Sequence, residues 1–109
     1  EALKVFQKTE HLSPSNIYAK TNQGLCYKKL GNIDKAIEVC GKALEIDKNN
    51  PYTLYNRACY NALNGNTKQA YIDLQRALKL DSQYIETAKN DEDFKGVFTI
   101  DDINKMINE

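Results

Sequence analysis

The sequence predicts an all-α fold, a stack of antiparallel helix pairs (an α-solenoid) closed by capping helices at its C-terminal end. Three observations predict this fold. The chain matches itself at a shift of 34 residues, and each copy carries apolar residues at helical intervals of three and four. No stretch sustains the period-two alternation of a β-strand. A single domain of stacked helix pairs follows from these features.

Composition excludes several classes of function. The 109 residues contain 15 Lys and Arg and 15 Asp and Glu, so the formal net charge is zero. Without a basic excess, we expect neither a nucleic acid nor a membrane surface as partner. The uninterrupted apolar runs are only a few residues long, too short for a membrane span or a signal-peptide core. The chain lacks an initiator Met, which is typical of a fragment or a processed product.

The repeat divides the chain into units. Residues 17–50 align with residues 51–84, and residues 1–16 align with the second half of a unit. We therefore expect residues 1–16 to be the second helix of a truncated repeat, followed by two full repeats and a different tail, residues 85–109. The pairs that are identical in the two full repeats are Tyr18/Tyr52, Asn22/Asn56, Gly31/Gly65, Asn32/Asn66, Ala36/Ala70, Ala43/Ala77, Leu44/Leu78 and Asp47/Asp81.

The first helix of each full repeat is predicted over residues 17–29 and 51–63. Gly31 and Gly65 follow these helices, and glycine just past a helix end takes the left-handed conformation at little cost. Asn50 precedes Pro51, a good N-cap before the residue best tolerated in a first helical turn.

The second helices are predicted over residues 33–46 and 67–80, where small residues recur at the same positions of each repeat. These small residues are Gly24 and Ala58 on the first helices and Ala36, Ala43, Ala70 and Ala77 on the second. Because small side chains let two helices approach closely, we expect them at the contact within each pair.

The period and these residues resemble the tetratricopeptide repeat family. Gly24-x-x-Tyr27 matches the family's G-x-x-Y element, and Ala2-x-x-x-Phe6 followed by Pro14 matches its A-x-x-x-F…P element. The resemblance covers roughly residues 1–84. It implies a right-handed superhelical stack whose first helices line a concave groove.

The chain departs from the family pattern at several positions. Lys20 replaces a Trp, Cys40 and Leu74 replace an aromatic residue, and Arg57 occupies an expected Leu position. Asp73 lies on the matching face of the next helix. The favoured interpretation is an ion pair between Arg57 and Asp73 that fixes the register of the two helices.

Cysteine and histidine usage predicts no catalytic, cofactor or metal site. Cys26, Cys40 and Cys59 are odd in number, lack CxxC spacing and lie in apolar helical stretches, so we expect reduced thiols that act as small hydrophobic residues. This use of cysteine favours a cytoplasmic protein. The single histidine, His11, offers no base for a nucleophile, and no glycine-rich phosphate loop is present. We therefore do not predict an enzyme.

The tail is predicted to cap the stack. Residues 85–95 begin as a helix with a polar outer face, as the end of a repeat array requires. Thr99 and Asp102 resemble a capping box that opens a last helix over residues 100–108, with one apolar face. That face is expected to consist of Ile100, Ile103 and Ile107.

A calcium loop between Asp91 and Asp102 is the alternative interpretation of the segment that joins these two helices. Lys95 stands where an oxygen ligand is needed, so a solvated loop is favoured.

The resemblance implies a groove lined by the first helices. Its predicted residues are Tyr18, Thr21, Asn22, Leu25, Lys28 and Lys29 in one repeat and Tyr52, Tyr55, Asn56, Cys59 and Leu63 in the next, with Glu86, Lys89 and Asp93 as an extension. Tyrosine offers broad contact with a polar tip, and asparagine can hold a peptide backbone. For Tyr18, Tyr52 and Tyr55 we favour binding. The remaining tyrosines in the repeats and tail are expected to pack between units, namely Tyr27, Tyr60, Tyr71 and Tyr84.

The predicted function is a non-catalytic scaffold that binds a peptide or helix of a protein partner in this groove. Some family members clamp the C-terminal carboxylate of a chaperone with Lys, Asn and Arg. Here Tyr52 and Asn56 stand where the next repeat would need the cations, so that ligand is not favoured. The alternative is self-association to a homo-oligomer through Leu3, Val5 and Phe6, which lack their usual partner helix.

Overall fold

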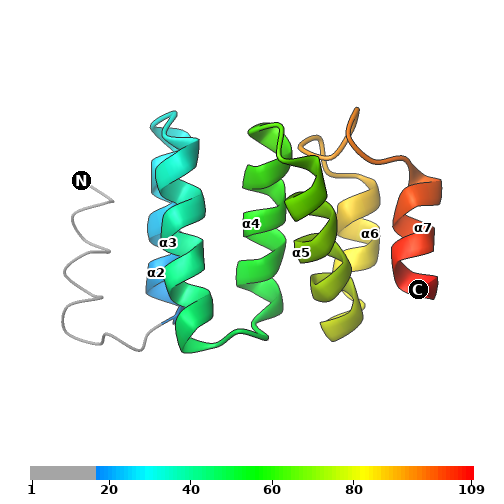
Figure 1. Cartoon of the computed structure of the whole chain (residues 1–109), viewed down its shortest axis with the longest axis horizontal. Helices are drawn as coiled ribbons and strands as arrows, with labels where there is room; N and C mark the ends of the chain where they lie inside the picture. The colour runs from blue at the N-terminus through cyan, green and yellow to red at the C-terminus, as the bar shows by residue number, and fades with distance from the viewer. Residues whose placement is uncertain (1–16) are drawn as a thin grey trace.

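The computed structural model describes residues 17–109, which form six α-helices and, over that range, no β-strand. The two full repeats comprise α2 (Ile17–Lys29), α3 (Ile33–Ile46), α4 (Pro51–Leu63) and α5 (Thr67–Leu80). These four helices begin and end at the predicted residues. The helices of each pair pack on one another, and α3 packs on α4, so the pairs stack in chain order (Figure 1). The predicted all-α stack of helix pairs is confirmed.

The predicted turn residues end and begin the helices. Gly31 and Gly65 have φ angles of 82° and 80°, in the left-handed region where a side chain would be strained. The Asn50 side chain accepts a hydrogen bond of 3.0 Å from the Thr53 backbone N–H, which confirms it as the N-cap of α4.

Small residues form the contacts within each pair, as predicted. Ala36, Ala43, Ala58, Ala70 and Ala77 are all fully buried. A Cβ atom built on Gly24 would lie 3.3 Å from the backbone oxygen of Ala36 and 3.4 Å from Cys40 Sγ. Helices α2 and α3 therefore touch through backbone atoms at this point.

The predicted ion pair between Arg57 and Asp73 is present and joins α4 to α5. Arg57 Nε and Nη2 donate to the two Asp73 carboxylate oxygens at 2.7 and 2.8 Å, and Asp73 is fully buried. Asn61 and Gln69 donate to the same carboxylate at 3.3 and 3.1 Å. The pKa of the Arg57 guanidinium is raised, chiefly by its hydrogen bonds to Asp73. The carboxylate is thus compensated from both helices.

The cysteines behave as small apolar residues. All three are free thiols; Cys40 and Cys59 are buried and Cys26 is half-buried. Burial raises the pKa of the Cys40 thiol to about 12. A neutral thiol packed in the helix contact is the form that such burial favours.

The C-terminal helices differ in part from the prediction. Residues 85–95 begin as a helix, as predicted, but helix α6 (Tyr84–Lys89) covers only the first part of that range. Asn90 Nδ2 donates to the Glu86 carbonyl at 2.9 Å, and Asp91 Oδ1 accepts from the Asp93 N–H at 3.0 Å. Asparagine and aspartate that bond to nearby backbone in this way favour turns over a continuing helix. Residues 90–98 accordingly form a chain of turns, which we call the acidic segment.

Helix α7 (Ile100–Asn108) opens with the predicted capping box. The Thr99 N–H donates to Asp102 Oδ2 at 2.9 Å, and the Asp102 N–H donates to Thr99 Oγ1 at 3.0 Å. The predicted apolar face is wrong at Ile100, which is 57% exposed, whereas Ile103 and Met106 are buried. Ile100 is the first helical residue and lies off the face that meets the stack.

None of the helices over residues 17–109 is long and apolar enough to cross a membrane.

Gly24→Val is expected to lower the free energy of unfolding by about 1–3 kcal/mol, because the new side chain forces α2 and α3 apart. Gly41→Ala is the control, since a Cβ there would come no closer than 4.0 Å to Arg57 and should give a gain of about 0.5–1 kcal/mol. Urea unfolding measures both. Equal stability of Gly24→Val and the wild type would contradict close packing at this position.

Arg57→Leu is expected to cost about 3 kcal/mol, because it leaves a buried carboxylate without its cation. The double variant Arg57→Leu/Asp73→Asn removes both charges and should recover at least half of that loss. Thermal and urea unfolding compare the two variants. A single variant as stable as the wild type would show that the pair does not hold α4 against α5.

Candidate functional site

Helices α2 and α4 lie next to one another and carry most of the predicted binding residues. We call the surface formed by α2, α4 and the acidic segment the first-helix face. On it, Tyr18 is 58% exposed, and Asn22, Leu25, Tyr52 and Asn56 are half-buried. Tyr18 and Tyr52, and Asn22 and Asn56, come from equivalent positions of the two repeats, and all five residues remain accessible.

The structure brings four of these residues together. The rings of Tyr18 and Tyr52 lie 5.8 Å apart between centroids. The Tyr52 hydroxyl donates to Asn22 Oδ1 at 2.9 Å, and Asn56 Nδ2 donates to the Tyr52 carbonyl at 2.9 Å. We call Tyr18, Asn22, Tyr52 and Asn56 the tyrosine–asparagine cluster. It presents aromatic surface beside carboxamide groups, and its side chains hold one another in place.

Thr21 was predicted to line the groove, but it lies inside the stack. It is 1% exposed, donates to the Ile17 carbonyl at 2.8 Å, and meets the Thr53 hydroxyl at 2.7 Å. This contact joins α2 to α4, so Thr21 fixes the helices rather than facing a ligand.

Tyr55 and Cys59 also differ from their predicted accessibility, because the acidic segment covers them. Tyr55 is 6% exposed and its hydroxyl donates to Asp91 Oδ2 at 2.7 Å. Its ring stacks on Tyr84 at 4.9 Å and meets the edge of Phe94 at 5.7 Å. Burial, followed by the hydrogen bond to Asp91, raises the pKa of the Tyr55 hydroxyl, which therefore acts as a neutral donor.

The second anchor of the acidic segment is an ion pair to α2. Lys28 Nζ lies 3.2 Å from Asp93 Oδ2, and both side chains are half-buried. Lys28 was predicted on the groove and Asp93 as its extension; the structure shows that they bind each other. The segment thus reaches across α4 to the first repeat that the structure describes.

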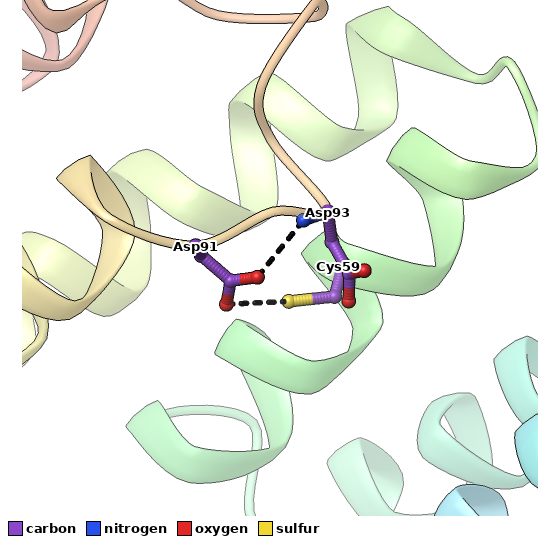
Figure 2. A group of neighbouring side chains, drawn as sticks. All are labelled: Cys59, Asp91 and Asp93. Atoms are coloured by element: carbon purple, nitrogen blue, oxygen red, sulfur yellow. Dashed lines mark hydrogen bonds between the residues drawn. The ribbon is translucent and has the colours of Figure 1, made fainter.

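Cys59 lies beneath this segment and forms a compact group with its residues Asp91 and Asp93. One ligand-type atom of each lies within 4.8 Å of the others. Figure 2 shows the Cys59 thiol directed at the Asp91 carboxylate, with an Sγ–Oδ2 distance of 3.8 Å. Burial, then the charges of Asp91 and Asp93, raise the pKa of Cys59. A protonated thiol is a weak donor and a poor nucleophile, and the Lys28 ammonium already provides positive charge at Asp93.

The alternative calcium loop is also occupied by internal contacts. Lys95 pairs with Glu92 at 2.8 Å, and Asp102 Oδ2 accepts the Thr99 N–H of the capping box. The expected solvated loop is wrong for part of the segment, because Phe94 is 1% exposed and Asp91 and Asp93 are half-buried.

The remaining predicted residues lie at the edges of the face or elsewhere. Lys29 and Leu63 are exposed, and the exposed Glu86 pairs with the half-buried Lys89 at 3.9 Å. Tyr27, Tyr60, Tyr71 and Tyr84 pack against or within the core, as expected. The predicted self-association residues Leu3, Val5 and Phe6, and also His11, lie outside the described residues.

Asp91 is the contact residue that sequence reasoning missed as part of this face. The only signal in the sequence was the local run of acidic residues, which is equally typical of a solvated surface.

Comparisons with known proteins agree with this architecture. Two family models described as tetratricopeptide repeat match residues 17–50 and residues 39–71, together half of the chain. Human sperm-associated antigen 1 is 29% identical over 86 residues, which cover 79% of this chain and 9% of that protein. Drosophila melanogaster FK506-binding protein 59 is 25% identical over 91 residues, 73% of this chain and 21% of that protein. The chain thus spans less than a quarter of either relative.

The fold is shared with a solved structure. The crystal structure of MamA superposes with a TM-score of 0.75 at 20% identity and covers 95% of this chain and 61% of the MamA chain. The repeat matches, the stacked helix pairs and this shared fold together show that the chain belongs to the tetratricopeptide repeat family.

Proposed function

We propose that the chain binds an extended peptide or a helical segment of a protein partner on the first-helix face, at the tyrosine–asparagine cluster. Tetratricopeptide repeats generally serve as non-catalytic scaffolds for protein interaction, and that role is the starting point of the proposal.

One observation supports the proposed position above the others. Tyr18 exposes 58% of its surface although its ring contacts the Tyr52 ring, with the two rings tilted by 35°. A tyrosine ring loses little rotamer entropy on binding and offers both apolar area and a hydroxyl, which is why tyrosine is enriched at binding hot spots.

The cluster is also organised before any partner arrives. Tyr52 is fixed through its hydroxyl to Asn22, and Asn56 is fixed to the Tyr52 carbonyl. A prearranged site avoids much of the entropy cost of ordering side chains at the interface. The carboxamides of Asn22 and Asn56 carry both donors and acceptors and suit the N–H and C=O groups of a peptide backbone.

Tyr18→Ala and Tyr52→Ala are each expected to weaken binding of a peptide selected from a display library by at least about 10-fold, which corresponds to roughly 1.4 kcal/mol. Isothermal titration calorimetry measures the affinity of the selected peptide, and circular dichroism confirms that each variant is folded.

Ile72→Ala is the matched control. Ile72 is also an exposed large side chain, 40% accessible, but it lies on α5 rather than on a first helix. Its removal should leave the affinity unchanged. If both tyrosine variants bind like the wild type, or if only Ile72→Ala weakens binding, the partner sits elsewhere.

A further inference from the structure

The acidic segment lies against the repeats as a bound peptide would. Three successive features carry the contact: the Asp91 carboxylate on the Tyr55 hydroxyl, the Asp93 carboxylate on the Lys28 ammonium, and the Phe94 ring on the Tyr55 ring. The residues between and after them point outward, with Glu92, Lys95 and Gly96 all exposed. The pattern that contacts the repeats is therefore an acidic residue, any residue, a second acidic residue and an aromatic residue.

The repeats supply a seat for this pattern from three positions. Lys28 offers an ammonium, Tyr55 offers a hydroxyl and an aromatic face, and Cys59 offers a thiol proton. All three are on α2 and α4, and Tyr55 and Cys59 follow Tyr52 and Asn56 of the tyrosine–asparagine cluster by three positions, the spacing of neighbours on one helix face. The seat and the open cluster are therefore neighbouring parts of the first-helix face.

The segment itself has little internal structure to hold it in place. Its backbone bonds are short turns, such as Phe94 N to the Asp91 carbonyl at 3.1 Å and Val97 N to the Phe94 carbonyl at 3.0 Å. It follows a helix of only six residues, α6. Phe94 belongs to the core, and Phe98 lies 5.9 Å from the Tyr71 ring. The segment is thus held by side-chain contacts with the repeats rather than by its own backbone, and segments of this kind open locally at lower cost than packed helices do.

We propose that the acidic segment is an internal ligand of the first-helix face, and that a partner peptide with the pattern acidic–any–acidic–aromatic binds the same seat in its place. The proposal rests on the proposed function and specifies the chemistry of the part of the partner that continues from the tyrosine–asparagine cluster onto the neighbouring seat. The tethered segment competes at a high effective concentration, so the intact chain binds such a peptide only in the fraction of molecules whose segment is released.

A fluorescent peptide of residues 90–98 is the probe for this exchange. The chain variant Asp91→Asn/Asp93→Asn loses both carboxylate anchors and should bind the probe at least about 10-fold more tightly than the wild type in fluorescence anisotropy. Glu92→Gln is the matched control, because it removes the same type of charge from an exposed position of the segment. It should bind the probe like the wild type.

The contribution of Lys28 to the seat is tested in the Asp91→Asn/Asp93→Asn variant, in which the segment is released. Adding Lys28→Gln to the double variant should abolish the gain in affinity, whereas adding Lys29→Gln, the exposed neighbour, should leave it intact. A probe in which both aspartates are replaced by asparagine should bind the double variant at least about 10-fold more weakly. Equal binding of the probe to wild type and double variant, no binding to the double variant, or indifference to Lys28→Gln would each overturn the proposal.

Hydrogen exchange gives a second measurement that does not require the double variant to fold. Lys28→Gln alone should speed exchange of the Phe94, Val97 and Phe98 amides by at least about 10-fold and leave the amides of α3 unchanged. Unchanged exchange in the segment would overturn the proposal.

The two proposals can fail separately. If a library peptide binds in a Tyr52-dependent way but the probe does not bind, the internal ligand is refuted and the proposed function is retained. Loss of the tyrosine dependence would sink the proposed function instead.

Discussion

The close approach of paired helices at small residues is the constraint on which the rest of the structure depends. At Gly24 the backbone of α2 comes within contact distance of the Ala36 carbonyl, and Ala58 and Ala70 are fully buried in the second pair. The two pairs use small residues at equivalent positions, so one can stack closely on the other. This stacking places the Tyr18 ring 5.8 Å from the Tyr52 ring and Asn22 within reach of the Tyr52 hydroxyl.

Buried polar contacts add the alignment that small residues cannot supply. Alanine and glycine permit close approach but allow one helix to slide along another. The Arg57–Asp73 pair fixes α4 against α5, and the Thr21–Thr53 hydroxyl contact fixes α2 against α4. Each contact has directional geometry and leaves a costly unpaired group if it slips. The positions of the first-helix face therefore follow from apolar and polar packing together.

The part of the fold that repeats could be predicted from the sequence, because its signals are local. The glycine after each first helix, the Asn50 cap and the alanine spacing determine α2 to α5 without knowledge of distant residues. The Arg57–Asp73 pair was also predictable, since the two positions face each other in any such helix pair. Ile100 was misplaced because helical spacing alone allows more than one apolar face, and contacts with the stack decide which is buried.

The candidate site was predictable only where it repeats. Tyr18, Asn22, Tyr52 and Asn56 were found from their equivalent positions, and the structure groups them. The covering of Tyr55 and Cys59 by the acidic segment could not be predicted, because the contact between Lys28 and Asp93 joins residues 65 positions apart. A run of acidic residues looks the same in the sequence whether it forms a solvated turn or a turn that is held by Lys28 and Tyr55.

The reach of Asp93 back to Lys28 also changes how the array comes apart. In a stack whose units touch only their neighbours, the end units fray first and loss proceeds step by step. Here an ion pair joins α2 to the segment that follows α6, so opening of that segment also removes a contact from α2. Local opening after α6 therefore also loosens the first repeat that the structure describes, a coupling that a stack with contacts only between neighbouring units lacks.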